Sequence, residues 1–82
     1  MTNIRIYSKQ YCPFCKAAKQ LLRSKGLRFE TIDVLKQPKR LQEMVDLSKR
    51  RTVPQIFFGD QHIGGYDDLI AYYRQSDQHS AA

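Results

Sequence analysis

"YCPFC" occupies residues 11–15 and contains the only two cysteines in the chain. Their C-x-x-C spacing serves three different purposes in proteins: a structural disulfide, half of a zinc site, or a pair of thiols that exchanges electrons. Each purpose needs different residues around the pair. The neighbouring sequence can therefore discriminate among the three.

A zinc site and a structural disulfide both fit this chain poorly. Besides the two cysteines, the only soft zinc ligands are His62 and His79, which are far apart in the sequence. A bond between Cys12 and Cys15 would close a very short loop, which removes little entropy from the unfolded chain. We therefore expect no metal and interpret the cysteines as a redox pair.

The two cysteines hold unequal positions on a predicted helix. Pro13 suits the first turn of a helix, so Cys12 falls at the helix N-terminus, where free backbone N–H groups and the helix dipole stabilise a thiolate. Lys9 and Lys16 add positive charge nearby. Cys15 follows one turn later beside the apolar stripe and is expected to be buried and less ionised. Cys12 is thus predicted to attack a disulfide, and Cys15 to resolve the resulting mixed disulfide.

Length and charge restrict the remaining functions. The 82 residues make one small domain, which we assign to residues 1–76, followed by a polar tail at 77–82. The net charge is +6, but the cations are spread along the chain without the basic, aromatic-interleaved run of a nucleic-acid module. No apolar stretch approaches the ~20 residues of a membrane span, and the N-terminus lacks a secretory signal. We expect a cytoplasmic monomer that binds neither nucleic acid nor membrane.

Hydrophobic spacing predicts the element order β-α-β-α-β-β-α. Alternating residues predict strands at 3–7, 28–34, 52–58 and 61–63. Helical spacing predicts helices at 13–25, from 38 onward and at 66–75. The apolar face of the first helix is predicted to comprise Phe14, Ala18, Leu21 and Leu22. The predicted fold is α/β, a mixed four-stranded sheet flanked by three helices, and a C-x-x-C beside its βαβ unit is typical of the thioredoxin fold.

Two further motifs each admit two interpretations. In "TVP" at 52–54, Pro54 either begins an edge strand or forms a cis bond that presents the backbone of Val53 to an extended peptide. In "GGYDDL" at 64–69, Asp67 and Asp68 either cap the third helix or, with its N-terminal amides, grip a ligand with ammonium and carboxylate groups.

Together these motifs resemble those of the glutaredoxins. The resemblance extends from the first strand to the third helix and rests on Y-C-P-F-C, T-V-P-Q-I-F and H-I-G-G-Y-D-D-L, in this order and at family-like spacing. It is strongest for the short bacterial type with two active-site cysteines. It implies a thioredoxin fold and a glutathione-dependent thiol–disulfide oxidoreductase. Such an enzyme reduces protein disulfides and glutathione mixed disulfides, donates electrons to reductases such as ribonucleotide reductase, and uses glutathione as co-substrate without a bound cofactor.

The resemblance also implies roles for individual residues. Cys12 matches the family's nucleophile and Cys15 its resolving cysteine. Lys9 and Tyr11 match residues beside the nucleophile, with Lys9 facing the glycine carboxylate of glutathione, and Arg51 is a candidate second cation there. The remaining glutathione-binding positions, which pair with the cysteinyl backbone or hold the γ-glutamyl end, are Thr52, Val53, a cis Pro54, Asp67 and Asp68.

Two alternatives stay open. The first is a glutaredoxin-like redoxin reduced by thioredoxin reductase, against which the acidic pair and Lys9 argue. The second is an iron–sulfur cluster carrier, against which Pro13 and the second cysteine argue. The sequence also departs from the family pattern at two places: "LSKRR" at 47–51 lacks the glycine that often follows the serine, and Tyr66 stands where relatives often have cysteine.

Overall fold

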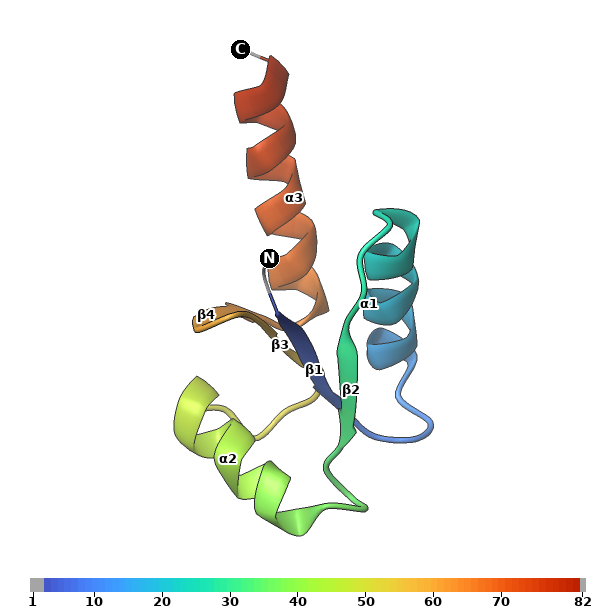
Figure 1. The fold of residues 1–82 in the computed structure, drawn as a ribbon, viewed down its shortest axis with the longest axis vertical. Coiled ribbons are helices and arrows are strands. Elements are labelled where there is room, and N and C mark those ends of the chain that lie inside the picture. Colours follow the sequence, from blue (N-terminus) through green and yellow to red (C-terminus); the bar gives the residue numbers. More distant parts are fainter. Residues whose placement is uncertain (1–2, 82) are drawn as a thin grey trace.

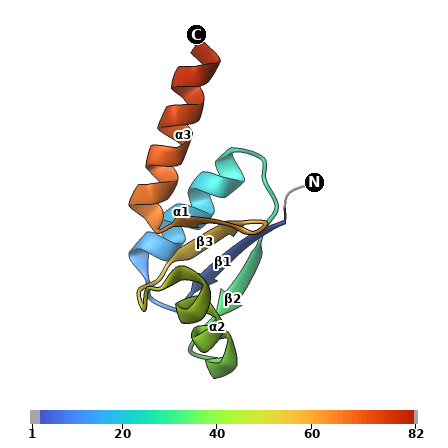
Figure 2. The same ribbon diagram turned by 90° about the vertical axis from the view of Figure 1, so that its left-hand side faces the viewer.

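The structure is a computed structural model that describes residues 3–81 and the side chains of residues 3–75. Its elements are β1 (Ile4–Ser8), α1 (Pro13–Ser24), β2 (Glu30–Asp33), α2 (Pro38–Ser48), β3 (Gln55–Phe58), β4 (Gln61–Gly64) and α3 (Tyr66–Ala81). The strand order is β2-β1-β3-β4, with β1 and β2 parallel and the other neighbours antiparallel. Helix α2 covers one face of the sheet, while α1 and α3 cover the other (Figure 1 and Figure 2). The predicted thioredoxin fold is confirmed.

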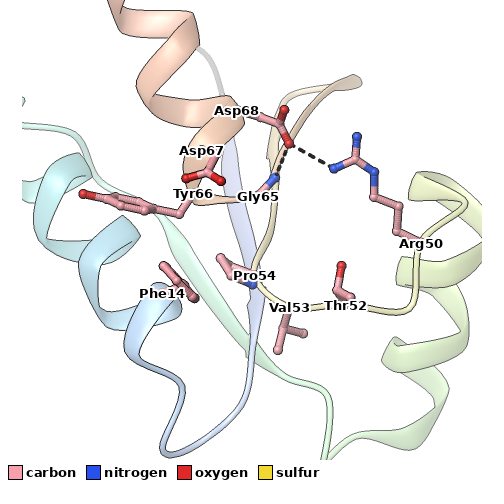
Figure 3. A pocket seen from close by; sticks show the side chains of 9 residues that line it. All are labelled: Phe14, Arg50, Thr52, Val53, Pro54, Gly65, Tyr66, Asp67 and Asp68. Carbon is pink, nitrogen blue, oxygen red and sulfur yellow. Dashed lines mark hydrogen bonds and ion pairs between the residues drawn. The ribbon is translucent and has the colours of Figure 1, made fainter.

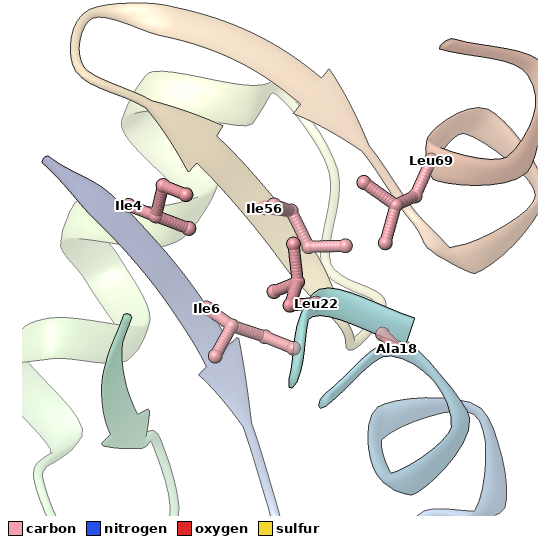
Figure 4. Packing of buried hydrophobic residues seen from close by; sticks show 6 residues of the cluster. All are labelled: Ile4, Ile6, Ala18, Leu22, Ile56 and Leu69. Atoms are coloured by element: carbon pink, nitrogen blue, oxygen red, sulfur yellow. The ribbon is translucent and has the colours of Figure 1, made fainter. Parts of the chain in front are cut away.

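The central strands β1 and β3 contribute to two hydrophobic cores, because successive side chains of a strand point to opposite faces. The core under α1 and α3 consists of Ile4, Ile6, Ala18, Leu22, Ile56 and Leu69 (Figure 4). The core under α2 consists of Tyr7, Ile32, Val34, Met44 and Phe57. Ile6 and Tyr7 are adjacent in β1 and fully buried on opposite faces. The central strands thus hold both helical layers to one sheet.

The apolar face of α1 differs from the prediction. Phe14 was assigned to the buried face, but its side chain is 62% exposed. The buried positions are Cys15, Ala18 and Leu22, which follow the i, i+3, i+7 spacing of a helix stripe. Phe14 lies about a quarter-turn off this stripe, at the first turn, where it borders a pocket described below. The burial that was predicted for Cys15 is observed.

Two element boundaries differ from the prediction by three residues or more. Strand β3 begins at Gln55 rather than at residue 52, because Pro54 has no N–H to donate to a neighbouring strand. Helix α3 continues to Ala81, beyond the predicted end at residue 75, and no glycine or proline interrupts it. Among the described residues, no helix is long and apolar enough to cross a membrane.

The turn after α2 is left-handed although no glycine stands there. Lys49 itself adopts the left-handed conformation, with φ 62° and ψ 22°, and its N–H bonds to the carbonyl oxygen of Val45. This conformation usually favours glycine at a helix end. The turn directs the chain towards α3 and so places Arg50 at the site described next.

Candidate active site

Cys12 lies at the N-cap of α1, as its position before Pro13 predicted. Its backbone is extended, with φ −107° and ψ 105°, and its Sγ accepts a hydrogen bond from the backbone N–H of Cys15 at 3.3 Å. The residue is partly exposed. A backbone N–H and the N-terminal end of the helix dipole thus face this sulfur, while solvent and substrates can still reach it.

Cys15 lies one turn further along α1 and is only 1% exposed. The pKa of Cys15 is raised to about 12, mainly because the thiol is buried and secondly because of its hydrogen bond with Cys12. At neutral pH it is therefore a neutral thiol. Both cysteines are free rather than disulfide-bonded. The structure thus places one accessible sulfur above one buried sulfur, which is the arrangement needed for sequential thiol–disulfide exchange.

Residues 52–54 lie opposite Cys12. The peptide bond between Val53 and Pro54 is cis, and the carbonyl oxygen of Val53 is 4.0 Å from the Sγ of Cys12. The alternative, in which Pro54 begins an edge strand, is wrong, because β3 lies between β1 and β4. The backbone of Val53 therefore borders the position that a substrate sulfur must occupy to react with Cys12.

A chain of hydrogen bonds centred on the buried Gln55 supports residues 52–54. The side chain of Gln55, a residue only 1% exposed, donates hydrogen bonds from Nε2 to the carbonyl oxygen and the Oγ1 of Thr52, at 3.0 and 3.2 Å. Its Oε1 lies 2.7 Å from the Nε2 of His62. Because an amide oxygen only accepts, His62 must carry its hydrogen on Nε2. Burial lowers the pKa of His62 and keeps it neutral. Sequence analysis missed Gln55, although a polar residue in the apolar run "QIFF" was a signal.

One hollow, of about 230 Å³, lies between α1, residues 52–54 and the start of α3 (Figure 3). We call it the Asp67 pocket. Its lining residues are Phe14, Arg50, Thr52, Val53, Pro54, Gly65, Tyr66, Asp67 and Asp68. The rings of Phe14 and Tyr66 pack against each other with centroids 6.2 Å apart. Tyr66, in the family's cysteine position, thus forms part of the pocket wall.

The two aspartates of the pocket are not equivalent. The Oδ2 of Asp68 accepts hydrogen bonds from the N–H of Gly65 and the Nη1 of Arg50, both at 2.9 Å. The bond from Gly65 contributes most to holding the pKa of Asp68 below its usual value, and the bond from Arg50 is the next contribution. Asp68 therefore caps α3, whereas Asp67 is exposed at the rim. Arg50 was missed by the sequence analysis, which singled out the adjacent Arg51; the left-handed turn at Lys49 brings Arg50 to this pocket.

A second hollow, of about 520 Å³, lies on the other side of Val53. We call it the Leu35 groove. Its lining residues are Lys9, Tyr11, Cys12, Pro13, Val34, Leu35, Leu41, Arg51, Thr52 and Val53. The lining includes two cations, Lys9 and Arg51, and no carboxylate. The structure thus brings the predicted residues together in two adjoining hollows that share Thr52 and Val53, with Cys15 buried beneath.

Comparisons with known proteins agree with this geometry. The glutaredoxin family model matches residues 4–63. Glutaredoxin 3 of Escherichia coli strain K12 is 49% identical over 71 residues, which cover 87% of this chain and 86% of that protein. Among solved structures, the glutathione complex of buckwheat glutaredoxin has a TM-score of 0.83 at 29% identity, covering 92% of this chain and 71% of that chain. Glutaredoxin from Brucella melitensis has a TM-score of 0.80 at 42% identity, covering 98% and 87%.

Proposed function

Since this chain belongs to the glutaredoxin family and is a glutathione-dependent thiol–disulfide oxidoreductase, we propose that Cys12 is its nucleophile and Cys15 its resolving thiol. The unequal placement of the two sulfurs carries this proposal. Cys12 is accessible at the N-terminus of α1, whereas Cys15 is buried with its pKa raised to about 12. Only the first sulfur can meet a substrate, and the second remains protonated beneath it.

For a glutathione mixed disulfide, the exchange needs Cys12 alone. The Cys12 thiolate attacks the glutathione sulfur, the old S–S bond breaks, and the partner leaves as a thiolate that takes up a proton. A second glutathione, as its thiolate, then attacks the glutathione sulfur bonded to Cys12. Glutathione disulfide leaves, and the Cys12 thiolate is restored. The net reaction consumes one free glutathione and converts the mixed disulfide into the partner thiol and glutathione disulfide.

For a protein disulfide, Cys15 completes the reaction. Cys12 first forms a mixed disulfide with one substrate sulfur, and the other substrate sulfur leaves as a thiol. Cys15 then loses its proton and attacks the sulfur of Cys12, which releases the second substrate thiol and forms a bond between Cys12 and Cys15. Two glutathione molecules reduce this bond. The raised pKa of Cys15 limits premature attack, because its thiolate is scarce at neutral pH.

We propose that glutathione binds across both hollows with its cysteinyl backbone beside Val53. Glutathione has an ammonium group at its γ-glutamyl end and a carboxylate at its glycine end. Asp67 lies at the rim of one hollow, whereas Lys9 and Arg51 line the other. The γ-glutamyl end therefore fits the Asp67 pocket, where Arg50 can bind its carboxylate, and the glycine end fits the Leu35 groove. The buckwheat glutaredoxin of similar fold was solved as a complex with glutathione, which supports glutathione as the ligand.

We further propose cytoplasmic glutathionylated proteins and protein disulfides, including those of reductases such as ribonucleotide reductase, as the substrates. A reducing compartment supplies the glutathione that the cycle consumes and keeps both cysteines as thiols. The partly exposed position of Cys12 supports access by a folded partner to a monomeric enzyme.

Two serine variants test the proposed roles. Reduction of the mixed disulfide between glutathione and 2-mercaptoethanol is followed by coupling glutathione disulfide formation to glutathione reductase. Cys12→Ser should abolish turnover, because no sulfur remains at the surface. Cys15→Ser should retain this activity but lose reduction of a protein disulfide by the intramolecular route. Full activity of Cys12→Ser, or an inactive Cys15→Ser with the small substrate, would overturn the assignment.

A further inference from the structure

The Leu35 groove has apolar walls that glutathione does not use. Val34 forms a buried part of its wall, Leu41 is half-buried, and Leu35 is 65% exposed. Glutathione consists of a γ-glutamyl group, a cysteine and a glycine, so the part that enters this groove carries no side chain at all. The cations Lys9 and Arg51 fit the glycine carboxylate of glutathione, but glycine has no side chain to cover the apolar wall of the groove.

Three of the four large exposed apolar side chains among the described residues lie at the two hollows beside Cys12. They are Tyr11, Phe14 and Leu35, whereas the fourth, Leu47, lines neither hollow. Tyr11 and Leu35 line the Leu35 groove together with Cys12, and Phe14 lines the Asp67 pocket. Tyr11 is 97% exposed and is held with φ 59°, which is rare for an aromatic residue. Single exposed apolar residues are ordinary, whereas a group around a reactive sulfur marks an interaction surface.

The charges of the two hollows fix the direction of a bound segment. The chain runs from Arg51 in the Leu35 groove, past Val53, to Pro54 in the Asp67 pocket. A segment that pairs antiparallel with residues 52–54 runs the opposite way, so its N-terminal end lies at the Asp67 pocket. This agrees with the placement of the ammonium end of glutathione beside Asp67. The residues that follow the attacked cysteine therefore enter the Leu35 groove.

We propose that the Leu35 groove is a docking site for protein substrates and binds the residues that follow the attacked cysteine. It prefers a large apolar side chain, which covers Leu35 and Leu41, together with an acidic residue, which pairs with Lys9 and Arg51. This inference rests on the proposed function, because it requires Cys12 to form the mixed disulfide. It adds a preference that glutathione, lacking such side chains, does not reveal.

A competition between peptides tests the preference directly. The Cys15→Ser variant, which traps the mixed disulfide on Cys12, is equilibrated with equal amounts of two blocked tetrapeptides, Gly-Cys-Phe-Glu and Gly-Cys-Ser-Glu, in a thiol–disulfide buffer. Intact-mass spectrometry gives the ratio of the two adducts. We expect the phenylalanine peptide to prevail by ~5-fold, since part of its ring leaves water. Replacing its glutamate by lysine should reduce this adduct in a salt-dependent way.

Two further variants and a reversed peptide locate the effect. Adding Leu35→Ser should bring the ratio close to one, while adding Leu47→Ser, at another exposed leucine outside the groove, should leave it unchanged. The reversed peptide Glu-Phe-Cys-Gly should show little advantage over its serine counterpart. Circular dichroism checks that each variant is folded.

The outcomes separate this inference from the proposed function. If no peptide and no glutathione attaches to Cys12, the assignment of the nucleophile fails and the docking site fails with it. If adducts form but the ratio is one, or if Leu35→Ser leaves the preference intact, only the docking site is overturned. An equal advantage for the reversed peptide would overturn the direction of binding.

Discussion

Replacing Gly64 by alanine should strain the junction between β4 and α3. Gly64 has φ 118°, an angle that costs an L-residue about 1–3 kcal/mol. A Cβ there would lie 2.6 Å from the Cγ and 2.8 Å from the Cβ of Asp68, so Asp68 must move. It would then lose its hydrogen bonds to Gly65 and Arg50, a partly exposed cap worth about 1 kcal/mol. Gly64→Ala should therefore reduce the free energy of unfolding by about 3 kcal/mol, a fall in Tm of roughly 10–20 °C.

Urea denaturation followed by far-ultraviolet circular dichroism measures this loss. Gly65→Ala is the matched control, since its Cβ would meet the Pro54 carbonyl oxygen at 3.5 Å and the Oδ2 of Asp68 at 3.9 Å, both ordinary contacts. A double-mutant cycle with Asp68→Ala tests the cause. That change removes the carboxylate in the way of the new Cβ, so the combined loss should be smaller than additive by about 1 kcal/mol. Strict additivity, or equal losses for the two glycine variants, would refute the argument.

The ionisation of two other side chains gives further tests. Because burial and then the bond to Cys12 raise the pKa of Cys15 to about 12, iodoacetamide at neutral pH should modify Cys12 alone; equal labelling in peptide mass maps would contradict this. Hydrogen bonds from the Tyr7 hydroxyl, which has the largest effect, and from Arg40 lower the pKa of Glu43. A carboxyl group with a lowered pKa stabilises the fold above its unfolded pKa, and this contribution is lost as pH falls through the folded value. Glu43→Gln should thus weaken the protein at pH 7 but flatten its loss of stability in acid. Urea midpoints of the wild-type protein and of Glu43→Gln, measured from neutral to acidic pH, give the two pH dependences. Parallel curves for the two proteins would contradict the prediction.

The fold was predictable because its signals are local. Alternation in residues 3–7 and 28–34, together with helical spacing after Pro13, defined the first βαβ unit, and α1 ends within one residue of the prediction, before a left-handed Gly26 with φ 71°. The site was predictable where a backbone element fixes a side chain, as for Cys12 and Cys15 on α1. Arg50 was missed and Phe14 was assigned to the wrong face, because the geometry of the helix ends decides where they point. A left-handed Lys49 has no sequence signal, yet it determines which of two adjacent arginines reaches Asp68.

The net charge of +6 says less about recognition than the separation of charges around Val53. On one side, Asp67 stands free at the rim, while Asp68 is already neutralised by Arg50. On the other side, Lys9 and Arg51 line a groove without a carboxylate. A uniformly basic surface would attract an anionic segment in either orientation. The observed separation favours one orientation, because turning the segment around would place an ammonium group beside two cations. Because Cys12 faces Val53, which lines both hollows, we propose that the charges that orient glutathione also determine which side of a substrate cysteine meets Leu35.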